Sequence, residues 1–199
     1  LHLLSRRQRQ MCIRDRFIAV FLLLSFWKNS TENYYSEIMK NDLTEGRMAF
    51  EKQLDIMCAG AFSVSNDSDL KWVYFLDGLK DGDNNIAALI RCNDMLRQTF
   101  ADSEHYQNYS VIMKNELIFR KSGMVVGDKF FYDNYCTYQN TDFETWRKQS
   151  FESNTWQLFP LEEIDTGERT FQAMTFSYPV RNYIQQEPEA NAVVQFLLS

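Results

Sequence analysis

The hydrophobic residues of this chain follow a helical period through its first half. Between residues 30 and 62 they form a one-sided stripe at spacings of seven, four, three and four, with charged residues at the other positions. A second stripe of helical period runs through residues 85–101. The stripes are Leu43, Phe50, Leu54, Met57 and Ala61, and then Ile86, Leu89, Ile90, Leu96 and Phe100. The pattern predicts a long helix over 30–62 and another helix over 85–101.

From residue 109 onward the hydrophobic period shortens to two, which is typical of strands. The predicted strands are 109–113, 117–120 ended by Ser122 and Gly123, 156–161 ended by Pro160, 169–178 and 192–198. The loop Lys114–Asn115–Glu116 joins the first two strands as a hairpin. Helices followed by paired strands predict an α+β fold with a mainly antiparallel sheet.

Two further helices are expected between the early and the late strands. Residues 128–138 are rich in aromatic residues and begin in a helical pattern. The sequence Thr141-Asp142-Phe143-Glu144 fits a capping box, with Thr141 as N-cap and Glu144 at the third helical position. We therefore expect a helix of about ten residues that carries Trp146.

Residues 17–27, FIAVFLLLSFW, are apolar except for Ser25. A membrane-spanning helix needs roughly 20 such residues, so this run suits either a signal-peptide core or a truncated transmembrane segment over 17–28. Arginines precede the run and an acidic region follows it, which places residues 30–199 outside the cytoplasm by the positive-inside rule. The alternative is a buried N-terminal helix in a soluble domain.

Both ends of the chain resemble cut ends. The string MCIRDR at 11–16 resembles translated sequencing-adapter read-through, which predicts that residues 1–16 are an artefactual extension. Under that interpretation, the arginines in this segment carry no information on membrane orientation. At the other end, AVVQFLLS (192–199) has the pattern of a buried strand with no polar tail after it. We expect the region 63–199 to be incomplete at its C-terminus.

Charge and cysteine content exclude several classes of function. Residues 17–199 hold 16 basic and 26 acidic side chains, so this segment is not expected to contact nucleic acid. The four cysteines form no C-x-x-C pair and are too few for a disulfide scaffold. Cys58, Cys92 and Cys136 are either small buried apolar residues or include one disulfide.

No enzymatic motif is present. The chain lacks a glycine-rich nucleotide loop and a G-x-S-x-G elbow, and its two histidines exclude a histidine triad or an H-E-x-x-H zinc site. We expect no catalytic residue, no metal and no cofactor in this segment. The candidate ligand-binding residues are the aromatic side chains Tyr132, Tyr135 and Trp146, and the carboxylate-pairing side chains Arg120 and Arg147. The alternatives are core packing for the aromatic residues and solvent exposure for the arginines.

Several stretches resemble the double Cache (dCache) sensor domains of membrane-bound AraC-type transcription regulators of Firmicutes. They are SVIMKNELIFRKSG (110–123), DKFFYDNY (128–135), FETWRKQSF (143–151), TFQAMTFSYPV (170–180) and AVVQFLLS (192–199). The resemblance covers residues 17–199 and implies a PAS-like sheet behind a stalk helix and a helical layer. The R-x-W element of the amino-acid-binding members is absent, and the nearest string, Trp146-Arg147, has the reverse order.

The resemblance implies that residues 63–199 are the membrane-distal lobe of an extracytoplasmic sensor. A small-molecule or protein signal would bind the lobe, and the stalk helix 30–62 would transmit the change. The stalk is expected to form a homodimer, and a DNA-binding domain would lie beyond Ser199. One alternative is the same sensor on a histidine kinase or another transmembrane receptor. A further alternative is a secreted small-molecule-binding protein.

Overall fold

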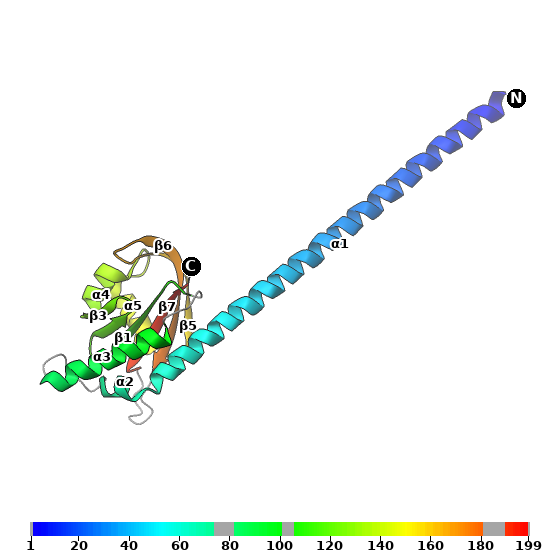
Figure 1. Ribbon diagram of the computed structural model, residues 1–199. Coiled ribbons are helices and arrows are strands. Elements are labelled where there is room, and N and C mark those ends of the chain that lie inside the picture. Colours follow the sequence, from blue (N-terminus) through cyan, green and yellow to red (C-terminus); the bar gives the residue numbers. More distant parts are fainter. Residues whose placement is uncertain (1, 74–81, 101–105, 181–189, 199) are drawn as a thin grey trace. The chain divides into compact units, whose positions relative to one another are not determined.

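The computed structural model describes residues 2–73, 82–100, 106–180 and 190–198, with side chains at all of these except 2–15, 72 and 82–85 (Figure 1). The chain divides into two compact units, Leu1–Lys52 and Gln53–Ser199. The first unit is the N-terminal part of helix α1 (His2–Ser65). The last turns of α1 belong to the second unit, which also holds the sheet.

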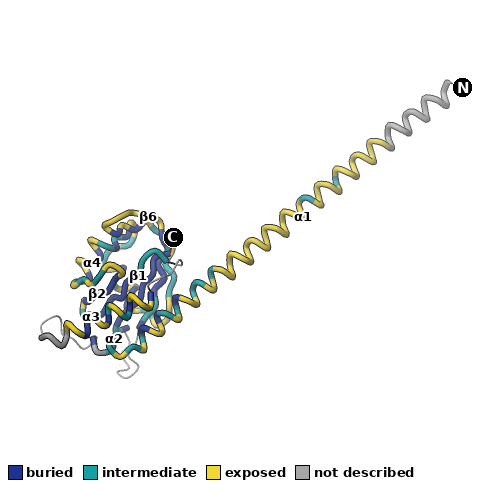
Figure 2. Tube along the Cα trace, viewed as in Figure 1, coloured by how far each residue is buried: buried dark blue, intermediate teal, exposed yellow. Residues whose placement is uncertain are grey.

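Helix α1 contains the whole predicted helix 30–62 and continues through the apolar run. In the first unit its side chains from residue 16 onward are almost all exposed (Figure 2), including Phe21, Trp27 and Leu43. Exposed ion pairs one turn apart, such as Arg47–Glu51 at 2.7 Å, support a solvated helix face. Among the described residues, no helix has both the length and the hydropathy required to cross a membrane.

The second unit is an α+β fold, as the sequence predicts. Within the described residues a curled antiparallel sheet of seven strands has the order β3-β2-β1-β7-β6-β5-β4. Its elements are α2 (Ser68–Val73), α3 (Gly82–Thr99), β1 (Asn108–Met113), β2 (Leu117–Arg120), β3 (Gly123–Val126), α4 (Asp128–Tyr135), β4 (Thr137–Tyr138), α5 (Phe143–Glu152), β5 (Gln157–Asp165), β6 (Thr170–Val180) and β7 (Ala192–Leu198). The order joins the early hairpin to the late strands through β1 and β7.

Strand β7 lies in the interior of the sheet, between β1 and β6. All seven of its residues are buried, which explains why AVVQFLL is an almost continuous apolar run instead of an alternating pattern. The predicted β1–β2 hairpin is also confirmed. Glu116 closes its loop with a φ of 66°, the left-handed conformation that typically ends a three-residue hairpin loop.

Helices cover both faces of the sheet. The face that packs on α4 and α5 is called the inner face, and the opposite face, which carries Tyr109 and Phe196, the outer face. On the outer face, the ring of Phe100, which follows α3, packs on Tyr109 at 4.8 Å and on Phe196 at 5.2 Å between centroids. Gly60 of α1 approaches the same ring so closely that an added Cβ would lie 2.9 Å from it. On the inner face, α4 and α5 pack against the sheet (Figure 1). The core there consists of Ile112, Ile118, Phe131, Tyr132, Cys136, Tyr138, Trp146, Phe151, Ile164, Ala173, Ala190, Val193 and Leu197.

The predicted N-cap of α5 and the predicted end of β5 are wrong. Helix α5 is capped by Asp142, whose carboxylate accepts a 2.8 Å hydrogen bond from the Thr145 N–H, and Thr141 instead donates to a glutamate on β5. Strand β5 does not end at Pro160, because a register shift after Phe159 lets the strand continue to Asp165. The second strand ends at Arg120 as predicted, but Gly123 then begins a further strand, β3, which the sequence did not suggest.

The buried face of α3 consists of partly different residues from those predicted. Leu89 and Leu96 are buried as expected, but Ile86 and Ile90 are exposed. Cys92, which the stripe omitted, is completely buried between Leu89 and Leu96 along the helix. A buried face of Leu89, Cys92 and Leu96 keeps the spacings of three and four that one helix face requires.

The disulfide alternative is also settled, because Cys58, Cys92 and Cys136 are all free thiols. Burial raises the pKa of the Cys92 and Cys136 thiols to about 12, and burial also raises the pKa of the half-buried Cys58. At pH 8 a thiol with that pKa is a thiolate in only about one molecule in ten thousand.

We expect Cys58 to be alkylated at least tenfold faster than Cys92 and Cys136 in the folded chain at pH 8, because thiolate and access both favour it. Iodoacetamide labelling followed by mass spectrometry measures the three rates, with Cys12→Ser as the background. In denaturant the three rates should become equal. Equal rates in the folded chain would contradict the burial of Cys92 and Cys136.

Candidate functional site

A row of polar side chains crosses the inner face of the sheet beside its apolar core. Arg120 on β2 pairs with Ser110 on β1. Ser110 pairs in turn with Gln195 on β7, and Gln195 pairs with Ser177 on β6. All four residues are buried. A buried polar group is costly unless it is hydrogen-bonded, so four adjacent ones mark this row as a candidate site.

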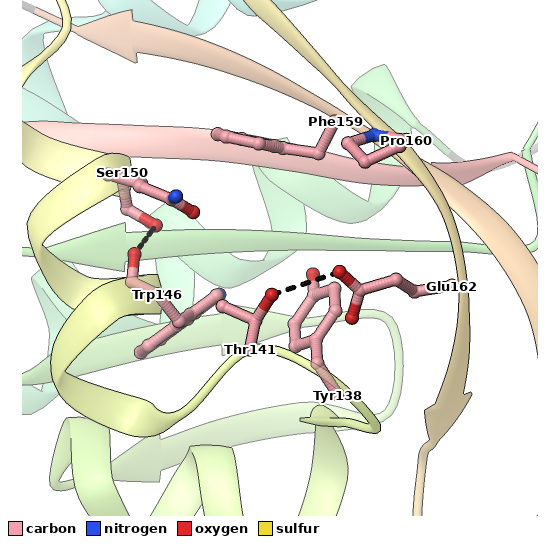
Figure 3. A pocket seen from close by; sticks show the side chains of 8 residues that line it. Tyr138, Thr141, Trp146, Ser150, Phe159, Pro160 and Glu162 are labelled. Atoms are coloured by element: carbon pink, nitrogen blue, oxygen red, sulfur yellow. Dashed lines mark hydrogen bonds between the residues drawn. The ribbon is translucent and has the colours of Figure 1, made fainter.

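A cavity of about 110 Å³ lies between α5 and the strands β4 and β5 at one end of the sheet order (Figure 3). Its walls combine aromatic rings with hydroxyl, amide and carboxylate groups. The lining residues are Tyr138, Thr141, Trp146, Gln149, Ser150, Phe159, Pro160 and Glu162. They come from β4, the loop after it, α5 and the irregular part of β5, so the register shift in β5 helps to shape the cavity wall.

Glu162 is held in place by hydrogen bonds to both of its carboxylate oxygens. The Thr141 hydroxyl donates to Oε1 at 3.0 Å (Figure 3), and the Asn140 backbone N–H donates to Oε2 at 3.3 Å. On the same side, the Tyr138 hydroxyl bonds the Thr175 hydroxyl at 2.9 Å. Burial raises the pKa of Tyr138 well above its usual value, so its phenol stays neutral and able to donate or accept a proton in a hydrogen bond.

Among the described residues, the buried polar atoms that have no hydrogen-bond partner include Nε1 of Trp146, which lines the cavity, and Oε1 of Gln195, whose side chain is bonded to the cavity residue Ser150. The rest of each residue is firmly bonded. Gln195 donates from Nε2 to the Ser150 hydroxyl at 2.9 Å, and that hydroxyl donates to the Trp146 carbonyl oxygen at 2.7 Å (Figure 3). The two residues that hold the unpaired donor and acceptor are thus linked through Ser150, which lines the cavity, and this favours a small molecule that carries both kinds of group.

The aromatic candidates divide between this cavity and the core. Trp146 lines the cavity and is 4% exposed. Tyr132 lies behind it, with its ring 5.4 Å from the Trp146 ring and stacked on Tyr138 at 6.3 Å. The Tyr132 hydroxyl donates to the Thr141 carbonyl oxygen, and burial raises the pKa of this phenol. Tyr132 therefore supports the cavity wall without lining it.

The two arginine candidates lie apart from the cavity. Arg147 forms an ion pair with Asp128 and so joins α5 to the start of α4. Arg120 lies on the polar row with its guanidinium carbon 3.8 Å from the centroid of the Tyr135 ring. The structure thus brings Arg120 and Tyr135 together and Tyr132 and Trp146 together, but it does not unite all five candidates in one pocket.

Sequence reasoning missed several residues of the site. Gln195 is the only polar residue in the strand AVVQFLL, and a polar residue inside a fully apolar strand is a usable signal. Glu162 and Ser150 carried no such signal, because their places depend on the β5 irregularity and on how α5 packs against the sheet. Within the described part of the chain, no group of three or more histidine, cysteine, aspartate or glutamate side chains is placed to hold a metal ion.

Comparison with known proteins gives no assignment. No protein-family model matches the chain, and no curated protein matches it significantly. The geometry of the site is therefore the basis for a functional proposal.

Proposed function

We propose that residues 63–199 form the ligand-binding lobe of an extracytoplasmic sensor, anchored to the membrane through residues 17–27. The output would be an AraC-type transcription regulator in a part of the protein beyond this chain. The observation that carries the proposal is the cavity lined by Trp146 and Ser150: among the described residues, Nε1 of Trp146 and Oε1 of Gln195, whose side chain is bonded to Ser150, are buried without a partner. Polar atoms in that condition favour a site that is completed by another molecule.

The position of the cavity supports signal reception. Tyr138 lines the cavity, and its hydroxyl is hydrogen-bonded to the Thr175 hydroxyl. Thr175 lies on β6, which is two strands from β1 in the sheet. On the other side of the cavity, Ser150 of α5 is bonded to Gln195 of the interior strand β7. A ligand that pairs with Gln195 would therefore act on a strand whose opposite face carries Phe196, which contacts Phe100 next to α3. This contact chain joins the cavity to the helical layer.

The volume of the cavity limits the ligand. An apolar cavity of about 150 Å³ holds benzene, which has six non-hydrogen atoms, so about 110 Å³ holds roughly four. The best small ligands gain at most about 1.5 kcal/mol per non-hydrogen atom. Four atoms then give a dissociation constant of some tens of micromolar at best, roughly 40 μM. The expected ligand is a small polar metabolite bound at micromolar to millimolar concentration.

Screening small polar compounds by thermal shift on the full 199-residue chain tests the proposal. We expect at least one compound of about four non-hydrogen atoms to raise Tm in a saturable way, since ligand binding to the native state stabilises it by mass action. In Thr141→Leu, which fills the cavity from its edge, the affinity for that compound should fall at least tenfold.

The matched control is Thr99→Leu, because Thr99 is an exposed threonine on α3 and lies outside the cavity lining. It should bind the compound as the unchanged chain does. Equal binding by Thr141→Leu and the unchanged chain would overturn the assignment of the cavity. A screen without any saturable shift at millimolar concentrations would overturn it as well.

Long-read sequencing across both ends of the gene tests the receptor part of the proposal. We expect the reading frame to continue beyond Ser199 into a second apolar span and paired helix-turn-helix motifs. A kinase module at that place would contradict the transcription-regulator output. A stop codon directly after Ser199 would contradict the receptor proposal and leave a small binding domain.

A further inference from the structure

A second concave site lies at another part of the inner face, around Arg120. It is a groove of about 350 Å³, separate from the cavity beside Trp146. The described lining residues are Gln107, Asn108, Arg120, Lys121, Ser122, Thr166, Glu168, Arg169 and Phe171. Three of these carry a positive charge and one carries a negative charge, although the chain as a whole is acidic. The groove is thus a local concentration of positive charge.

Arg120 is the central group of this groove. Arg120 is only 8% exposed, and its guanidinium carbon lies 3.8 Å from the centroid of the Tyr135 ring. Stacking on an aromatic face fixes the plane of a guanidinium and leaves its N–H groups free to donate at the edge. Arginine in that arrangement is organised in advance for a planar, two-pronged acceptor such as a carboxylate.

The counter-ion that Arg120 has in the structure is a weak one. Among the described residues it forms an ion pair with Glu168, at 3.7 Å between Nη2 and Oε1. That distance exceeds a normal charge-assisted hydrogen bond, and the Glu168 side chain is 78% exposed. A buried cation with a distant and solvated partner is incompletely compensated. A second carboxylate that approached Arg120 more closely would therefore bind it more strongly than Glu168 does.

The β5–β6 turn holds the mouth of the groove in a defined shape. The Thr166 N–H and hydroxyl both donate to the Arg169 carbonyl oxygen, at 3.1 and 2.9 Å. The Gly167 N–H donates to the Asp165 carboxylate at 2.8 Å. The Arg169 guanidinium donates to the side-chain oxygen of Gln107 and lies 4.8 Å from the Phe171 ring. The turn thereby places Glu168 and Arg169 at one groove.

We propose that this groove binds a small organic carboxylate. Two N–H groups of Arg120 donate to the ligand carboxylate, which displaces Glu168, while Lys121 and Arg169 attract the anion at the rim. The internal occupant of the site is itself a carboxylate, and this favours a planar carboxylate over a tetrahedral phosphate. The inference does not depend on the receptor proposal or on the cavity beside Trp146.

Titration of the full 199-residue chain with sodium succinate at constant ionic strength tests the inference, followed by isothermal calorimetry or by the Arg120 Nε–H resonance. We expect saturable binding that is at least tenfold tighter than for inorganic phosphate. Arg120→Gln should weaken the binding at least tenfold. Glu168→Gln should strengthen it severalfold, because the competing carboxylate is removed from a side chain that is largely solvated.

Glu168→Gln keeps the test decisive even if Arg120→Gln fails to fold. The control for general charge is Arg97→Gln, since Arg97 is an exposed arginine on α3 and is not part of the groove lining. It should leave succinate binding unchanged. Binding that is unaffected or weakened in Glu168→Gln would overturn the inference. Equal affinities for phosphate and succinate would also overturn it, as would a loss in Arg97→Gln as large as that in Arg120→Gln.

Discussion

Replacing Gly167 with alanine should destabilise the second unit by about 2–5 kcal/mol. Gly167 has a φ of 75°, and a Cβ at this position would lie 2.3 Å from the backbone oxygen of Asn134 at the end of α4. A backbone atom cannot rotate out of the way as a flexible side chain can. The β5–β6 turn and α4 must therefore separate. Urea unfolding followed by far-UV circular dichroism measures the loss.

Gly123→Ala is the matched control for this substitution. Gly123 also has a positive φ, 136°, but no heavy atom of the described residues lies within 4 Å of the position that its Cβ would occupy. Its cost is confined to backbone strain of about 1–3 kcal/mol. The difference between the two variants isolates the contact with Asn134. Equal losses would show that the turn does not pack on α4 as described.

Trp146→Ala should destabilise the unit by about 3–5 kcal/mol, the usual cost of removing a large buried aromatic side chain. The indole contacts the rings of Phe131, Tyr132 and Phe143, with centroids 5.4 to 6.1 Å away. Its removal would enlarge the cavity and leave three aromatic residues without a common neighbour. Equilibrium unfolding in guanidinium chloride provides the measurement.

Trp146→Phe distinguishes the ring from its N–H group. Phenylalanine keeps an aromatic ring in place and removes Nε1, which is buried and has no partner within the described part of the chain. An unsatisfied buried donor costs about 1–3 kcal/mol, so its removal should offset most of the lost volume. We expect a net change within about 1 kcal/mol. A loss as large as that of Trp146→Ala would show that Nε1 is satisfied in the unliganded chain.

The sequence predicts those parts of the fold whose pattern is local. The hairpin around Lys114–Glu116 and the helix carrying Trp146 are confirmed, because turn length and helical period are set by neighbouring residues. Strand β3 was missed because its partner, β2, decides that it is a strand, and its own four residues do not alternate in hydrophobicity. The continuation of β5 past Pro160 depends likewise on β6.

The candidate site was only partly predictable for the same reason. Aromatic and arginine residues suggest ligand chemistry by type, and Trp146 and Arg120 do lie at concave sites. Which of them share a site depends on the pairing of strands that are far apart in the chain, whereas turn length fixes the register only within a hairpin. Ser110 and Gln195 are 85 positions apart in the chain, yet the β1–β7 register makes them direct neighbours. No local pattern contains that information.

Because β7 is an interior strand and the last one in the sequence, the sheet cannot be completed until β7 itself has been synthesised. Ribosomes add about 5–20 residues per second, so β1 is complete roughly 4–16 s before β7 begins to appear. Until then the edges of β1 and β6 that will pair with β7 have unpaired backbone N–H and C=O groups, which can bond to another polypeptide chain. A nascent chain of this protein is therefore exposed to aberrant pairing for seconds, and the cell has a reason to shield it with a chaperone.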